Sequence, residues 1–236
     1  MKKTIHKADS RGYADHGWLK SYHTFSFANY YNPERSKFGV LRVLNDDVIE
    51  AGMGFGTHPH DNMEIITIPL KGEVAHKDST GTKGVIKDNE VQIMSAGSGL
   101  THSEFNNSES DPLSLLQIWL FPKEKNIKPR YDQRSFSAEE MKNSFKTVVS
   151  PDEADKALWI NQDSVFALTN IDKGKSVKYD IKFKGNGMYL FVIDGSVKID
   201  GDVLSARDAM GIEDADGIEV TAEENSKVLL IELPMN

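Results

Sequence analysis

Two short motifs in the first half of the chain place possible metal ligands two residues apart. His58 and His60 form a His-x-His pair, and His102 and Glu104 form a His-x-Glu pair. In a β-strand, residues i and i+2 point to the same face about 6.6 Å apart, so each pair can direct two side chains to one point. Neighbouring strands would then present three imidazoles and one carboxylate, a set that suits Fe, Ni, Cu, Co or Zn. We therefore predict one mononuclear metal site made by these four residues.

A single histidine is weaker evidence, because most lone histidines on apolar strands are hydrogen-bonded core or surface residues. Two strand-spaced pairs, each preceded by glycines, rarely arise by chance. The other histidines are expected to be structural or exposed, although one in an aromatic segment could face a cavity: His6, His16, His76 and, in that segment, His23.

Composition narrows the range of partners and ligands. The chain has 28 basic and 36 acidic residues, a net charge of −8, so its surface repels phosphate backbones and anionic lipids. We expect no direct nucleic-acid partner and no membrane partner. The absence of cysteine leaves only nitrogen and oxygen ligands for a metal. The N-terminus has no secretory pattern and no apolar run could cross a bilayer, so a cytoplasmic location is expected.

Short apolar alternations separated by Gly, Asn and Asp run from Thr24 to Pro122 and return from Trp159 to Pro234. This spacing predicts an all-β protein built of sandwiches or barrels. Between the two runs, Ser137 and Glu140 form a capping-box pattern that predicts a short helix. We therefore expect a metal-binding domain over residues 1–125, a connector with a short helix over 126–150, and a second domain over 151–236.

The two halves resemble weak copies of one another. LKGEVAHKD in the first half matches IDGSVKIDG in the second, which predicts an internal duplication. All seven histidines, however, lie at or before His102, and the places of His58 and His60 fall near Ile181 and Phe183. The second half cannot repeat a histidine metal site.

These motifs carry a family resemblance. GMGFGTHPHDNMEIITIPLKG resembles the first cupin motif and GSGLTHSEFN the second, although Gly97 stands where proline is common. HGWLKSYHTFSFANYYNP, FGVLRVLNDDVIEAGMGFGTHPHDNMEI and IMSAGSGLTHSEFN resemble bacterial members of the pirin family over nearly the whole chain. The resemblance implies two antiparallel cupin (jelly-roll) β-barrels, the C-terminal one degenerate.

The resemblance also bears on which glutamate is a metal ligand. In most cupins the first-motif glutamate, here Glu64, joins the histidines, whereas pirins use one two residues after the third histidine, here Glu104. Strand geometry favours the same choice, because Glu64 lies four residues beyond His60, about 13 Å along an extended strand. We expect Glu64 to be a structural carboxylate or one that orients a ligand.

The activity implied by the resemblance is that of a quercetin 2,3-dioxygenase, which opens the central ring of a flavonol with O₂. Glu104 would then be the catalytic base as well as a ligand. The cofactor would be one divalent transition metal ion, iron first, with nickel, copper, cobalt, zinc or manganese as alternatives. Several aromatic side chains could line the substrate pocket or simply pack in the core. They are His23, Phe25 and Phe27, which alternate along one predicted strand, and Phe55 and Trp119.

Three other readings stay open from the sequence. The protein could be a non-catalytic regulator whose metal state controls binding to a protein partner, or the site could serve a different small-molecule reaction. A purely structural metal is the third. We expect a monomer whose partners are a flavonol-like aromatic substrate and O₂.

Overall fold

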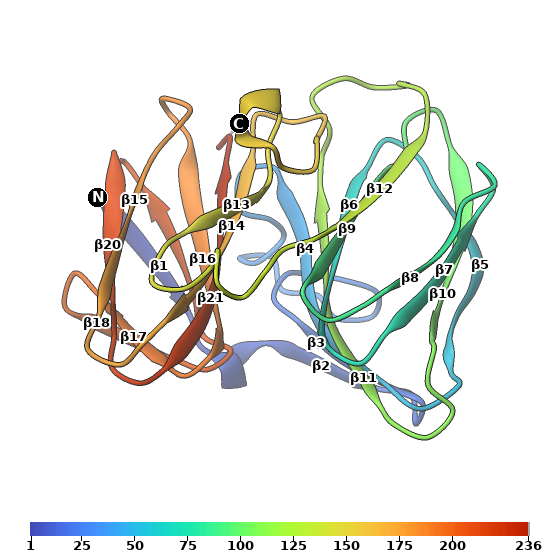
Figure 1. Ribbon diagram of the computed structural model, residues 1–236, viewed down its shortest axis with the longest axis horizontal. Coiled ribbons are helices and arrows are strands. Elements are labelled where there is room, and N and C mark those ends of the chain that lie inside the picture. Colours follow the sequence, from blue (N-terminus) through green and yellow to red (C-terminus); the bar gives the residue numbers. More distant parts are fainter. Residues whose placement is uncertain (236) are drawn as a thin grey trace.

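The computed structural model describes residues 1–235, whose regular secondary structure is almost entirely β-strand (Figure 1). The strands of the first half are β2 (Gly12–Asp15), β3 (Leu19–His23), β4 (Leu41–Ile49), β5 (Gly54–His60), β6 (Glu64–Lys71), β7 (Val74–Asp78), β8 (Lys83–Ile86), β9 (Glu90–Ser95), β10 (Leu100–Asn106), β11 (Leu113–Leu120) and β12 (Arg130–Ser135). The strands of the second half are β1 (Lys2–His6), β13 (Lys146–Val149), β14 (Val165–Ile171), β15 (Ser176–Asp180), β16 (Gly187–Asp194), β17 (Ser196–Ile199), β18 (Asp202–Ser205), β19 (Ala209–Glu213), β20 (Gly217–Ala222) and β21 (Ser226–Leu233). Two 3₁₀ turns, η1 (Ala8–Ser10) and η2 (Glu153–Asp155), are the helical elements of the described chain.

Each half consists of a large sheet and a small sheet of antiparallel strands. In the first half, the order β12-β9-β6-β11-β4-β3-β2 forms the large sheet and β5-β10-β7-β8 the small one. The second half repeats this plan with β1-β19-β16-β21-β14-β13 and β15-β20-β17-β18. The all-β antiparallel architecture predicted from the sequence is confirmed, and the matching strand orders agree with a duplication.

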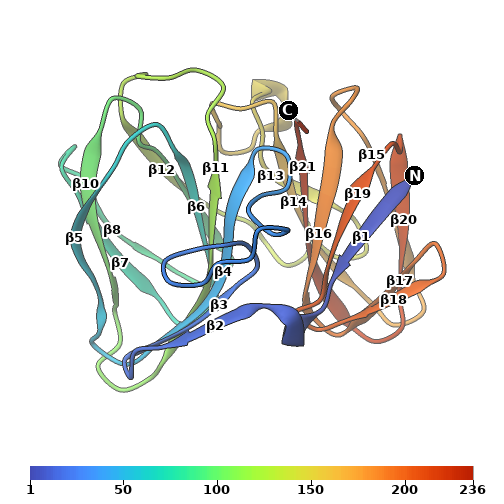
Figure 2. The ribbon, with the colours of Figure 1, turned by 180° about the vertical axis from the view of Figure 1, so that it is seen from behind.

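The N-terminal strand belongs to the second half rather than to the first. β1 pairs with β19 through five register pairs and takes the place that β12 holds in the first half. Figure 2 shows β1 beside β19, separated by η1 from β2 in the other half. The division at residues 125 and 150 stays a prediction, but strand pairing crosses it, because β12 joins the first half and β13 (Lys146–Val149) the second. The two halves are therefore interlocked by the chain itself.

The prediction of a short helix after Ser137 was wrong, because this segment forms a turn. The capping-box hydrogen bonds are present, since Ser137 Oγ donates to Glu140 Oε2 over 2.9 Å and the Glu140 amide donates back over 3.3 Å. The chain then bridges to β14 through backbone hydrogen bonds of Met141 and Asn143 with Asn170. Asn143 also has a φ of 50°, a left-handed conformation that ends a helix. Sheet pairing thus overrides the local helical signal.

The large sheets of the two halves pack face to face around a shared apolar core. This core includes Leu44 of β4, Phe191 of β16 and Leu229 of β21, all completely buried. Phe25 was predicted to alternate with His23 along one strand, but β3 ends at His23. Phe25 instead packs against Tyr189 with ring centroids 5.6 Å apart, between the halves. No helix in residues 1–235 is long and apolar enough to cross a membrane.

Candidate metal centre and cavity

Three of the predicted ligands meet between two paired strands of the small sheet. His58 and His60 lie on β5, His102 lies on β10, and the register places His102 opposite His58. Their ring centroids are 4.4 to 4.9 Å apart. One nitrogen from each ring lies within 4.8 Å of the others, a spacing that allows an ion to sit among them.

Glu104 lies beside this cluster, and its side chain is hydrogen-bonded to residues of the large sheet. The pairing of β10 with β5 shifts register between His102 and Glu104, a β-bulge that re-aims the side chain. Glu104 is 3% exposed, and its carboxylate accepts hydrogen bonds from Thr67 Oγ1 at 3.1 Å and Gln117 Nε2 at 2.8 Å. It groups within 4.8 Å with His102 and His76, so His102 connects the two clusters.

The electrostatics of the site favour neutral imidazoles with free lone pairs. Burial lowers the pKa of His60 to about 4 and that of His102 to about 3, so both rings are uncharged at neutral pH. His58 Nδ1 lies 2.8 Å from the Gly56 carbonyl oxygen, to which it can donate, leaving Nε2 free to bind. Both ring nitrogens of His102 are buried without a hydrogen-bond partner within residues 1–235. Buried polar atoms are normally paired, so these residues fit a divalent ion.

His76 is a member of the site that the sequence did not predict. It lies on β7 directly opposite Glu104, and its ring centroid is 5.4 Å from that of His102. Its Nε2 is 3.0 Å from Asp78 Oδ2, which fixes the ring. His76 and Asp78 are two residues apart in the sequence, a spacing that could have indicated this strand, but only the strand pairing places His76 beside Glu104.

Glu64 contacts other parts of the fold. It is completely buried on β6, where it accepts hydrogen bonds from Ser95 Oγ at 2.8 Å and from the Asn161 amide at 3.2 Å. Asn161 lies in the segment that leads into the second half. The Glu64 carboxylate therefore joins the two halves, and it belongs to neither histidine group.

A cavity of about 500 Å³ opens onto the predicted metal ligands His58 and Glu104, a size typical of small-molecule sites. His58 and Glu104 contribute to its wall. The aromatic part of the wall pairs Trp18 with Phe55 at 5.3 Å and Phe27 with Trp119 at 5.4 Å between ring centroids. The polar part is made by Ser21, His23, Asn45, Asp47 and Gln117. The structure thus brings His23, Phe27, Phe55 and Trp119 to one cavity, and it leaves Phe25 out.

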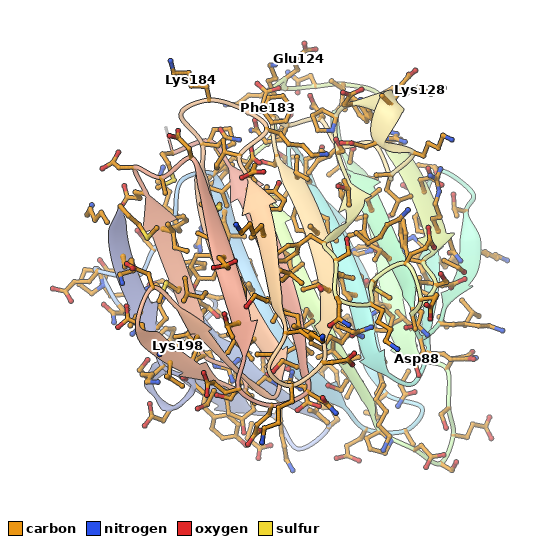
Figure 3. All side chains as sticks on the ribbon, turned by 60° about the vertical axis from the view of Figure 1, so that its left-hand side comes forward. Asp88, Glu124, Lys128, Phe183, Lys184 and Lys198 are labelled. Carbon is orange, nitrogen blue, oxygen red and sulfur yellow. The ribbon has the colours of Figure 1, made fainter. Side chains whose placement is uncertain are left out.

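Within residues 1–235, the second half has no comparable cluster of possible metal ligands. In the loop after β15, the backbone amides of Lys182 and Phe183 donate to the Glu232 carboxylate at 2.9 and 2.7 Å. Tyr179 and Asn186 donate to the same carboxylate, which is completely buried. Figure 3 shows Phe183 and Lys184 in this loop, at the same end of the molecule as Glu124 and Lys128. A carboxylate saturated by hydrogen bonds supports the fold and leaves no open site.

The fold and this cluster define a two-domain cupin with one candidate metal centre. Residues 4–120 match the Pirin family and residues 147–233 match the family described as the quercetinase C-terminal cupin domain. The chain belongs to the pirin family.

Relatives match over nearly the full length. The chain is 46% identical to quercetin 2,3-dioxygenase of Escherichia coli K12, with 98% of each chain covered, and 43% identical to a putative quercetin 2,3-dioxygenase of Pseudomonas aeruginosa, covering 95% of this chain and 97% of that one. The crystal structure of the bacterial pirin YhhW from E. coli in complex with nickel(II) superposes with a TM-score of 0.94, at 44% identity and with 100% of both chains covered.

Proposed function

We propose that this chain is a metal-dependent dioxygenase that opens the central ring of flavonols such as quercetin with O₂. Its ion would be held by His58, His60, His102 and Glu104. The observation that carries the proposal is the cluster of His58, His60 and His102, with the carboxylate of Glu104 beside it, at the wall of an aromatic-lined cavity. The similarity to E. coli quercetin 2,3-dioxygenase and to the nickel complex of a bacterial pirin supports it.

In this proposal the bound ion would act as a Lewis acid and would allow the substrate to react with O₂. The protein supplies the remaining functions. Glu104 would accept the proton of the substrate hydroxyl that approaches the centre, because a carboxylate at the wall of the cavity meets the geometry required of a general base. Thr67 and Gln117 hold this carboxylate in place. Trp18, Phe27, Phe55 and Trp119 exclude water and favour a flat aromatic ring.

Reconstitution with single metals tests this function. Metal-free protein is loaded under anaerobic conditions with Fe(II), Ni(II), Mn(II), Co(II), Cu(II) or Zn(II), and O₂ uptake is recorded with quercetin. We expect uptake matched by loss of flavonol absorbance with at least one metal, iron or nickel first, and none in the His102→Ala variant. Metal-loaded protein that binds quercetin yet consumes no O₂ with any of these metals would refute the proposal and favour a regulator that acts through a protein partner.

We further propose that the protein acts as a monomer in the cytoplasm, on small molecules rather than on nucleic acids. The net charge of −8 supports the last point, because such a surface repels phosphate backbones. Light scattering of the purified protein measures its mass in solution and so tests whether it is a monomer. A mass of twice 26.4 kDa would exclude the monomer.

A further inference from the structure

Two neighbouring strands of the large sheet present four polar side chains to the cavity. Ser21 and His23 alternate on β3, and Asn45 and Asp47 alternate on β4. The register pairs Ser21 with Asp47 and His23 with Asn45, so the four side chains form a compact square on one face. Each residue is 3% exposed, and all four line the cavity that reaches the metal ligands.

The square is hydrogen-bonded internally but keeps a free acceptor. Ser21 Oγ donates to Asp47 Oδ1, and His23 Nδ1 lies 3.0 Å from Asn45 Oδ1. Burial lowers the pKa of His23, so this ring is neutral and Nδ1 can carry the proton that Asn45 accepts. No other hydrogen bond reaches the Asp47 carboxylate from residues 1–235, which leaves its second oxygen available to a ligand.

Asp47 differs from its neighbour Asp46, which forms ion pairs. Asp46 points to the opposite face of β4, where Arg11 and Arg207 each approach its Oδ2 at 3.2 Å. Asp47 has no such cation among the ion pairs of the described chain, and burial raises its pKa to about 7. A buried carboxylate without a cation costs stability, which apolar side chains at the same position would avoid. Stability alone therefore does not explain Asp47.

We propose that Ser21, His23, Asn45 and Asp47 form a subsite that binds a hydroxyl group of the substrate other than the one at the metal centre. The inference rests on the proposed function and narrows it to a substrate class, namely planar polyphenols with at least one hydroxyl beyond the 3-hydroxy-4-keto unit. Asp47 accepts a hydrogen bond from that hydroxyl, and the aromatic wall covers the ring that carries it. Selectivity among flavonols then depends on this square, whereas ring opening depends on the metal ligands.

Asp47→Asn tests the subsite, because it keeps the shape and removes the charged acceptor. The protein is loaded with nickel, and binding of quercetin and of 3-hydroxyflavone, which lacks the additional hydroxyls, is measured without O₂ by fluorescence quenching. We expect Asp47→Asn to weaken quercetin binding roughly ten- to hundredfold, the effect of losing a hydrogen bond to a charged group, and to change 3-hydroxyflavone binding less than about threefold. Asp132→Asn, an acidic residue on β12 whose side chain is 42% exposed, is the matched control and should change neither.

The outcomes separate this inference from the proposed function. Equal weakening of both flavonols, or of neither, overturns the subsite even if the enzyme turns flavonols over. Selective weakening without any O₂ uptake supports the subsite while the dioxygenase assignment fails. Absence of binding of either flavonol to the loaded wild type overturns both. If circular dichroism shows that Asp47→Asn is unfolded, Ser21→Ala, which removes the hydroxyl that orients Asp47, must show the same selective loss, and equal affinities overturn the subsite.

Discussion

Replacing Glu104 by Gln should abolish most turnover while keeping the fold. Glu104 accepts one hydrogen bond from Thr67 and one from Gln117. The variant keeps one oxygen acceptor, but its NH₂ group would face the NH₂ group of Gln117, which is also a donor. Rotation of the Gln117 amide by about 180° presents an oxygen to that NH₂ group and restores the pair. The cavity therefore keeps its shape, and the main loss is the negative charge and the proton-accepting oxygen.

The expected magnitudes follow from these contacts. Hydrogen bonds to a charged group contribute about 1.5–3 kcal/mol and neutral ones about 0.5–1.5 kcal/mol, whereas the neutral amide avoids burying a carboxylate. The two effects oppose each other, so the metal-free variant should unfold within about 2 kcal/mol of the wild type. Loss of a general base should lower turnover by about 10²–10⁴. Glu64→Gln is the matched control. Removing the hydrogen-bond partner of a metal ligand typically lowers activity about 10–100-fold. Turnover of Glu64→Gln should fall by less than this, because Glu64 contacts Ser95 and Asn161 rather than a predicted ligand.

Metal content by mass spectrometry, O₂ uptake with quercetin and thermal unfolding are measured for both variants. Glu104→Gln should retain part of its metal and lose turnover, and Glu64→Gln should retain both. Wild-type turnover in Glu104→Gln would eliminate Glu104 as the base. Loss of metal from Glu64→Gln, with full metal in Glu104→Gln, would transfer the ligand role to Glu64.

Three further predictions concern the ligands, the interlocked strand and pH. His102→Ala should lose stoichiometric metal but remain folded by circular dichroism, because neither ring nitrogen has a partner in the described structure; global unfolding would instead indicate a structural ion. Deleting residues 1–7 should lower the free energy of unfolding in urea by several kcal/mol, because β19 loses all five pairs with β1. Lys2→Ala, which removes one exposed ion pair, should leave the free energy of unfolding nearly unchanged. The pKa of Asp47 is raised by burial from 3.8 to about 7, so the wild type loses stability as pH rises through this window. Asp47→Asn should therefore gain stability relative to the wild type with a slope of up to about 1.4 kcal/mol per pH unit between pH 4 and 7, and a pH-independent difference in urea denaturation would contradict the burial of this charge.

The sequence contained enough information for the fold class and for the cluster of histidines. Strand periodicity and repeated turns predicted an all-β chain in two similar halves, and the His58–His60 pair marked one strand as a candidate metal-binding strand. These signals are local, because i and i+2 residues of a strand share a face in any β-protein. Asn45 and Asp47 share a face of their strand by the same i, i+2 rule, a signal that could have indicated the polar wall of the cavity.

Features that depend on which strands pair could not be read from the sequence. His76 joins the site because β7 lies beside β10, and Glu104 is held by Thr67 and Gln117 because the large sheet packs over the small one. The predicted helix after Ser137 failed for a similar reason, since pairing with β14 outweighed its capping signal.

The amino-acid sequence by itself determined which side chains are available for chemistry and that they lie on strands. It excluded thiolate ligands and a histidine site in the second half. The tertiary structure decided which of these side chains meet and that β1 completes the second half. It also decided that one cavity joins His58 and Glu104 to the square of Ser21, His23, Asn45 and Asp47. The physical reason is that hydrophobic burial selects the face of each strand locally, whereas the partner of each strand is chosen by packing between segments far apart in the chain.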